Sequence, residues 1–326
     1  MIDLLKYKKY YFIISIALIL AGIIGLLVNG LNYDIQFKGG TIIEIEMENN
    51  DYDANKIGVE LTNMLNKKVS SQKLQAYNPE NKDKEINILM LKIPGTAALN
   101  EDEINTIIEY LTTYYNAGKV HQMENVQPFI AAEMKQKGVE AVLVASVLII
   151  IYIWYRFSSI SGLPAAITAL LALMHDLAIM FSAYTIFKVP LNESFIAAAL
   201  TILGYSINNT IVVYDRIREN NKRMRRTSLD ELVNKSVLQS FTRSVNTSVT
   251  TLIAVVIVYL YASINNIQSV KEFAFPLIIG LISGTYSSLF IAPSLWFVWE
   301  ERKTRQKIVT KQVKVYDSSG NLDYNN

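Results

Sequence analysis

The stretch GLPAAITALLALMHDLAIMFSAYTIF, residues 162–187, decides the fold of this chain. It is apolar along nearly its whole length. As a helix rising about 1.5 Å per residue, it is long enough to cross the ~30 Å of hydrocarbon in a bilayer. Near its centre stands a single carboxylate, Asp176, directly after His175. The stretch therefore predicts a membrane span with an ionisable group at mid-depth.

Five further apolar runs have comparable lengths, and they lie at 11–29, 138–157, 192–213, 245–263 and 272–298. Of the 326 residues 51% are hydrophobic and 18% are charged, whereas an average soluble protein carries roughly 25% charged residues. The first run follows a basic start and could be a signal peptide. It is longer than a typical signal-peptide core and lacks a small-residue cleavage site before the next domain, which favours an uncleaved anchor. The chain is predicted to be a polytopic α-helical membrane protein with six transmembrane helices.

Lysine and arginine residues predict which side each segment faces. They gather in the N-terminal segment 1–10, at Arg156, in the loop 214–244 and in the tail 299–326, whereas the two short opposite loops hold only Lys188 and Lys271. By the positive-inside rule, both termini are expected in the cytoplasm.

The basic run 216–226, which includes Arg225 and Arg226, could also indicate nucleic-acid binding. Topology and attraction to anionic lipid headgroups explain it more simply, because the net charge of the chain is only +2. No nucleic-acid partner is predicted. The run Ser228-Leu-Asp-Glu231 resembles a capping box, so an amphipathic helix is expected to lead into the fifth span.

Residues 30–137, between the first and second spans, are polar enough to fold in water on the non-cytoplasmic side. Alternating and helical apolar spacings predict strands at 41–47, 73–77, 86–93 and 119–126, and helices at 54–67 and 101–115. The order βαββαβ is that of an α+β ferredoxin-like domain.

This domain shows no catalytic constellation. The chain has no cysteine, which excludes thiolate chemistry, and His121 has no partner motif. Glu44, Glu46 and Glu48 share one face of a strand, which is interpreted as a solvated face; contact with a cation or a basic peptide is the alternative. No catalytic residue, metal site or cofactor is predicted.

Polar groups inside the spans are the candidate functional residues. A charged side chain at the centre of a span costs about 2.5–3.5 kcal/mol, so Asp176 is the leading candidate for an ion or proton pathway. A structural hydrogen-bonding group between helices is the alternative. Asn208 and Asn209 share a face with Tyr205, and Arg243 begins a polar stripe in the fifth span, where its side chain could instead extend to the interface. Gly280 and Gly284 form a GxxxG pattern, which is typical of close helix packing.

Several motifs together indicate a family. The run LTILGYSINNTIVVYDRIREN, residues 200–220, contains Gly204, Tyr205, Asp215 and Arg216 and resembles the fourth-span signature of the SecF family of bacterial protein-export subunits. Shorter motifs follow in the same order as in that family: 37–41 with Gly39 and Gly40, 152–157, His175-Asp176, 242–251 and 284–288.

The resemblance implies one half of a resistance-nodulation-division type transporter that pairs with SecD in the bacterial plasma (inner) membrane. It further implies association with a SecY-type translocon and YidC, action on unfolded preproteins, and use of a proton or sodium gradient. The position of Asn209 is usually aspartate in that family, and asparagine cannot exchange a proton near neutral pH. The relay acid is then expected to come from SecD or from Asp176. Otherwise, this half of the transporter is not itself coupled to protons.

Two other functions remain open at this stage. A half-size exporter of lipids or small molecules would have the same topology, although the fourth-span signature argues against it. An intramembrane hydrolase would need two facing carboxylates, and Asp215 lies at the cytoplasmic edge, far from a suitable geometry with Asp176. The sequence does not support an enzyme.

Overall fold

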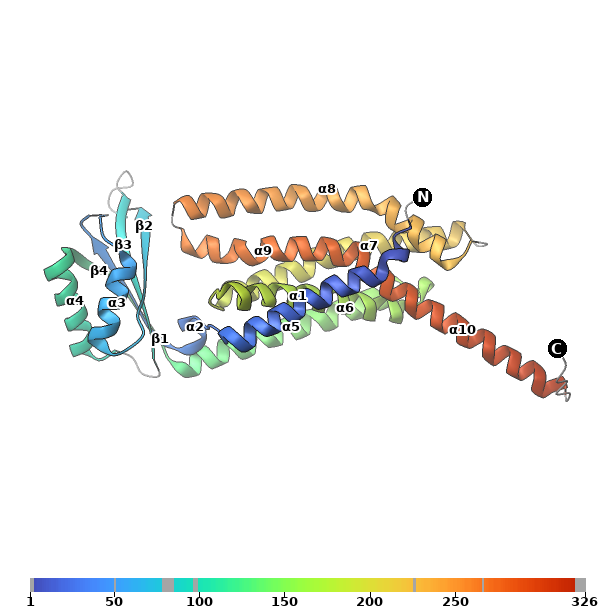
Figure 1. The fold of residues 1–326 in the computed structure, drawn as a ribbon, viewed down its shortest axis with the longest axis horizontal. Coiled ribbons are helices and arrows are strands. Elements are labelled where there is room, and N and C mark those ends of the chain that lie inside the picture. Colours follow the sequence, from blue (N-terminus) through green and yellow to red (C-terminus); the bar gives the residue numbers. More distant parts are fainter. Residues whose placement is uncertain are drawn as a thin grey trace.

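The computed structural model describes residues 3–49, 51–77, 85–95, 99–224, 227–265 and 267–319. Arg225 and Arg226 of the basic loop, and residues 320–326 of the tail, lie outside these ranges. Figure 1 shows a bundle of long helices with a small α/β domain at one end. The N-terminus and the projecting helix α10 lie at the opposite end of the bundle (Figure 1).

Among the described residues, six helical segments are long and apolar enough to cross a membrane. They are α1 (Lys8–Asn29, preceded by a 3-10 turn at Leu5–Tyr7), α5 (Pro128–Arg156), α6 (Gly162–Phe187), α7 (Glu193–Arg223), α8 (Leu229–Ile264) and the continuous run from α9 (Gln268–Tyr286) through a π-helical segment (Ser287–Ile291) into α10 (Ala292–Ser319). The chain is thus a multi-pass membrane protein.

Several helices extend well beyond the apolar runs. α5 begins at Pro128 rather than near 138, α7 continues to Arg223, and α10 runs to Ser319 inside the predicted tail. The expected amphipathic helix and the fifth span form a single helix, α8. Hydropathy marks only the part of a helix that is apolar, whereas the backbone ladder continues into water where no Pro or Gly interrupts it.

The expected capping box at the start of α8 is absent. Ser228 occupies the N-cap position, but its side chain makes no capping hydrogen bond.

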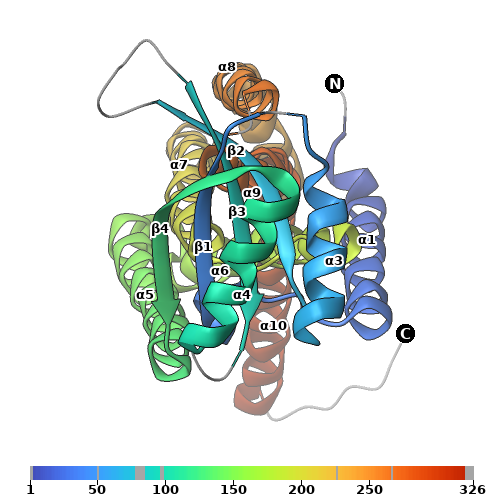
Figure 2. The ribbon, with the colours of Figure 1, turned by 90° about the vertical axis from the view of Figure 1, so that its left-hand side faces the viewer.

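The small domain has the predicted ferredoxin-like topology. Its elements are β1 (Gly40–Met47), α3 (Ala54–Leu65), β2 (Ser70–Tyr77), β3 (Glu85–Pro94), α4 (Glu101–Tyr115) and β4 (Ala117–Val126). The antiparallel sheet has the order β2-β3-β1-β4, so β3 lies between β1 and β2. Ile43 and Ile45 alternate into the core beneath α3 and α4, which cover one face of the sheet, while the bundle lies behind the other face (Figure 2).

The junction between the domain and the bundle is short and specific. The turn α2 (Ile35–Lys38) is capped by Asp34, whose carboxylate also bonds Lys92 of β3 at 2.7 Å. Gly39 and Gly40 follow with φ of +84° and +143°. A Cβ at Gly40 would lie 2.4 Å from the carbonyl oxygen of Ile93, so this turn requires glycine.

Glycine also controls how α1 packs on α6. A Cβ at Gly22 would lie 2.7 Å from the Cα of Ser182, and the Gly22 carbonyl accepts a hydrogen bond from Thr185 Oγ1 at 2.9 Å. The two backbones therefore touch without an intervening side chain, as in small-residue interfaces of membrane helices.

We predict that Gly22→Ala forces α1 away from α6 and destabilises the bundle by about 1–3 kcal/mol, the usual range for overpacking. The measurement is the thermal unfolding midpoint of the purified chain in detergent. Gly204→Ala is the matched control, because a Cβ at Gly204 meets nothing within 4 Å. Equal midpoints for Gly22→Ala and the control would show that the α1–α6 contact is not tightly packed.

Candidate functional site

The carboxylate of Asp176 on α6 is enclosed by hydroxyl groups from two other spans. Its side chain is 1% exposed. Oδ2 accepts hydrogen bonds from Ser206 of α7 at 2.6 Å and from Ser287 at 2.7 Å. Oδ1 accepts one from Ser283 of α9 at 2.6 Å and lies 3.1 Å from Nδ1 of His175. We call this group of five residues the carboxylate cage.

The cage matches the hydrogen-bonding capacity of an ionised carboxylate, which has about four acceptor sites. Each hydrogen bond to a charged group contributes about 1.5–3 kcal/mol. Three hydroxyl donors therefore offset the cost of about 2.5–3.5 kcal/mol for an acidic side chain at the centre of a span. If the carboxyl takes up a proton, a serine hydroxyl can rotate and accept from it. The cage therefore offers a hydrogen-bond partner to either protonation state of the carboxyl.

Close helix packing brings the cage together. A Cβ at Gly284 would lie 3.0 Å from the Cβ of Ser206, and one at Gly280 would lie 2.4 Å from Ile202 Cγ1. The two glycines thus let the last span, which carries Ser283 and Ser287, lie close against α7 beside Ser206 and Asp176. At Ser287 the last span changes to π winding, a feature that is frequent at functional sites.

A line of polar groups continues from the cage to α1. His175 Nε2 lies 2.9 Å from Ser15 Oγ, and Ser15 Oγ lies 3.5 Å from the hydroxyl of Tyr286. Tyr286 in turn donates to the backbone carbonyl of Tyr11 at 2.7 Å. Imidazole, hydroxyl and phenol groups can each donate and accept, so this line has the chemistry of a proton relay.

Sequence reasoning missed part of this arrangement. It did not pair His175 with Asp176, whereas the imidazole ring lies against the carboxylate, and it did not select Ser15, Ser206 or Tyr286. Ser15 carried a signal, because it is the one polar side chain between Phe12 and Val28 in the first apolar run.

The other predicted pathway residues lie outside the cage. Asn209 is buried between α7 and α8, where its amide donates to Ser248 Oγ at 3.3 Å, and Tyr205 donates to the same oxygen at 3.4 Å. Asn208 and Arg243 are exposed on the outside of the bundle. Within the described ranges, no hydrogen bond or ion pair connects Asp176 directly to Asn209 or Arg243.

The signature acid Asp215 has a different role, at the end of the bundle away from the domain. Its Oδ1 bonds Arg156 at the end of α5 at 3.2 Å and Arg218 at 2.5 Å. Arg216 pairs with Glu219 at 2.7 Å. The Arg156–Asp215 pair joins α5 to α7, whereas the other two pairs lie within α7, and Asp215 is far from a dyad geometry.

The acidic strand face is less exposed than the solvated face that the sequence predicted. Glu44 lines a cleft of about 170 Å³ between the sheet and the start of α9, and burial raises the pKa of its carboxyl. Glu46 Oε1 lies 3.4 Å from Nδ1 of His121, while Glu48 is exposed. In the part of the chain that the structure describes, no group of three or more His, Asp or Glu side chains has the arrangement of a metal site.

Comparison with known proteins identifies the family. Residues 106–302 match the family described as "Protein export membrane protein SecD/SecF, C-terminal". The chain is 34% identical to the protein translocase subunit SecF of Alicyclobacillus acidocaldarius over 93% of its own length and 94% of the relative's. The chain belongs to the SecF family. The SecF of Petrotoga mobilis is 32% identical over 94% of this chain and 99% of that protein.

Solved structures agree with this assignment. The crystal structure of SecDF from Thermus thermophilus, titled a translocon-associated membrane protein, matches 92% of this chain with a TM-score of 0.76 and 28% identity. A second SecDF structure, in the super-membrane-facing form, matches 95% with a TM-score of 0.69. The chain spans only 39% and 40% of those two proteins. SecF relatives are translocase subunits, so this chain is a protein-export subunit of the membrane and not an enzyme.

We predict that Asn209→Asp, which introduces the residue usual in the SecF family, changes the free energy of unfolding by less than about 1 kcal/mol. The hydroxyls of Ser248 and Tyr205 already face this position and can donate to a carboxylate. The measurement is the thermal midpoint in detergent. In the matched variant Asn209→Asp with Ser248→Ala, the carboxylate loses a donor and the midpoint falls. If Asn209→Asp alone unfolds the protein, this is a packing position.

Proposed function

We propose that this chain is the SecF-type accessory subunit of a Sec translocase, which pairs with SecD and uses the transmembrane ion gradient to promote preprotein export. The observation that carries the proposal is the carboxylate cage, because it places an acid at mid-membrane with partners for both of its protonation states. In this scheme a SecY-type translocon and YidC are further partners, and unfolded preproteins are the substrates.

Polar residues on the outer surface of the bundle support pairing with a second membrane subunit. Asn208 on α7 and Arg243, Asn246 and Thr250 on α8 are exposed where lipid would otherwise surround them. Polar groups facing hydrocarbon are costly, and a partner helix that offers hydrogen bonds removes this cost. The protein translocase subunit SecDF of Bacillus subtilis supports the same pairing: 93% of this chain matches 39% of that longer protein at 33% identity.

Orientation follows from the basic segments. With the N-terminal segment, the segment 214–244 and the part of α10 from residue 299 onward in the cytoplasm of a bacterial inner membrane, the ferredoxin-like domain faces outward. The basic residues Lys222 and Arg223 at the end of α7 are then near anionic headgroups of the cytoplasmic leaflet. Moving one elementary charge through 100 mV supplies about 2.3 kcal/mol, so a few ions suffice for a modest rearrangement of packed helices.

The connection between α6 and α7 offers a physical route from the cage to the domain. Asp176 lies on α6 and its donor Ser206 lies on α7, so a change in the cage acts on both helices. In the loop that joins these helices, Leu191 donates to the carbonyl of Asn32 at 2.8 Å and accepts from the amide of Asp34 at 2.9 Å. Asp34 holds the β3 lysine Lys92. Movement of α6 relative to α7 would therefore be transmitted to the domain through the segment that joins the domain to the first span.

We predict that Asp176→Asn abolishes the stimulation of export by the ion gradient while leaving membrane insertion and SecD binding intact. Asparagine keeps the size and one oxygen acceptor of the aspartate but cannot exchange a proton. The measurement is translocation of a preprotein into inverted vesicles with and without a gradient, and the gradient-dependent part of transport is expected to be lost. Asp215→Asn, at the edge of the bundle, is the control and should retain the response. Normal gradient-dependent export by Asp176→Asn would remove this residue from the mechanism.

A further inference from the structure

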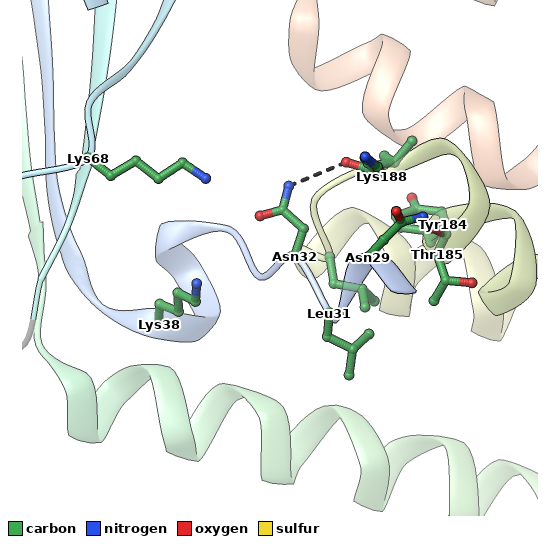
Figure 3. Close-up of a pocket in the computed structure, with 11 residues that line it drawn as sticks. Asn29, Leu31, Asn32, Lys38, Lys68, Tyr184, Thr185 and Lys188 are labelled. Atoms are coloured by element: carbon green, nitrogen blue, oxygen red, sulfur yellow. Dashed lines mark hydrogen bonds between the residues drawn. The ribbon is translucent and has the colours of Figure 1, made fainter. Parts of the chain in front are cut away.

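A cavity of about 290 Å³ lies where the ferredoxin-like domain meets the spans (Figure 3). Three lysines from separate segments line it: Lys38 at the end of α2, Lys68 just before β2, and Lys188 just after α6. All three side chains are exposed. Figure 3 shows the side chains of Lys38 and Lys68 extending into the space between the domain and the spans.

The described lining of this cavity provides no counter-charge for its three lysines. Its lining contains no Asp or Glu, and within the described ranges none of the three ammonium groups forms an ion pair. The backbone carbonyls at the end of α6 accept hydrogen bonds from asparagine side chains rather than from these lysines. Asn29 donates to the Thr185 carbonyl at 3.0 Å, and Asn32 donates to the Lys188 carbonyl at 3.3 Å. The ammonium donors of the lysines therefore remain available to a ligand.

The cavity lies at the level where two spans end. Asn29 is the last residue of α1, and Lys188 directly follows the last residue of α6. Figure 3 shows both residues beside the junction with the domain, and Figure 1 shows the domain at the end of the bundle opposite the N-terminus and α10. The short loops between spans on the domain side otherwise contain few lysines. The positive-inside rule gives no reason for positive charge on this side. This depth is that of lipid headgroups.

Apolar side chains continue from the cavity along the span surface. Leu27 near the end of α1 is 80% exposed, and Phe187 at the end of α6 is 67% exposed. A phosphate held by the lysines would therefore be adjacent to a surface suited to acyl chains. A free phosphate ion would bind the lysines but would leave the exposed apolar surface without a role.

We propose that this lysine cavity binds the phosphate of an anionic phospholipid headgroup at the membrane surface on the domain side. Lysine is a compact charge with three donors and binds phosphate as a point charge. Because Lys38 and Lys68 belong to the domain side of the junction and Lys188 to the spans, the bound lipid links the two and stabilises the docked orientation of the domain. The site is separate from the carboxylate cage and does not depend on ion coupling.

Native mass spectrometry of the full chain in detergent tests the proposal, with phosphatidylglycerol and phosphatidylcholine added in equal amounts. We expect the wild type to retain phosphatidylglycerol preferentially. The triple variant Lys38→Gln, Lys68→Gln, Lys188→Gln should lose about fivefold in affinity per lysine, which corresponds to about 1 kcal/mol each. The matched control, Lys56→Gln, Lys119→Gln, Lys137→Gln, removes the same charge from exposed positions outside the cavity and should bind like the wild type.

Two further arms complete the test. Excess inorganic phosphate should not displace the lipid, because it lacks the acyl chains. The three single variants, each at an exposed position, repeat the measurement if the triple variant does not fold. Equal retention of phosphatidylglycerol by the wild type and the cavity variants would overturn the proposal. Displacement by inorganic phosphate would overturn the assignment of the ligand as a lipid.

Discussion

The hydrogen bonds between the Asp176 carboxylate and serines of two neighbouring spans constrain the rest of the bundle. A carboxylate in hydrocarbon is stable only if its acceptor sites are filled, and here the donors come from α7 and from the last span. Those donors reach it because Gly284 lets the helices approach closely. On the proposed function, the packing of these three spans and the protonation of this side chain are coupled.

The same helices carry the ferredoxin-like domain. The loop between α6 and α7 pairs with the segment that precedes the domain, through the bridge of Tyr33 with Leu191 and the hydrogen bond of Gln36 with Glu193 at 3.1 Å. On this account the domain is held by a short junction with both polar and apolar contacts. A lipid in the lysine cavity would reinforce this junction at its membrane surface. Ion coupling, through α6 and α7, and lipid binding, in the lysine cavity, would then both act on the junction between the domain and the spans.

Sequence patterns predicted the six spans and the ferredoxin-like domain, because long apolar runs and alternating apolar residues each have one dominant structural solution. Asp176 stood out because a charge in an apolar run is costly. The partners of Asp176 did not stand out, since serine is common in membrane helices and only the packing of α6, α7 and α9 shows which serines face the acid. Asn208 and Asn209 are neighbours in sequence, yet one faces outward and the other faces α8. Helix ends beyond the bilayer were also hidden from hydropathy, which is why α7 and α8 proved longer than their apolar parts.

The central claim is that Asp176 changes its protonation state. Infrared difference spectroscopy of the full chain together with SecD in lipid, recorded across a pH titration, measures this directly. The account predicts a carboxylic acid C=O band that appears as pH falls and is missing in the Asp176→Asn variant, with the band responding to an imposed proton gradient. A spectrum in which no pH-dependent carboxyl band distinguishes the wild type from Asp176→Asn would contradict it, and the cage would then be a fixed structural contact between helices.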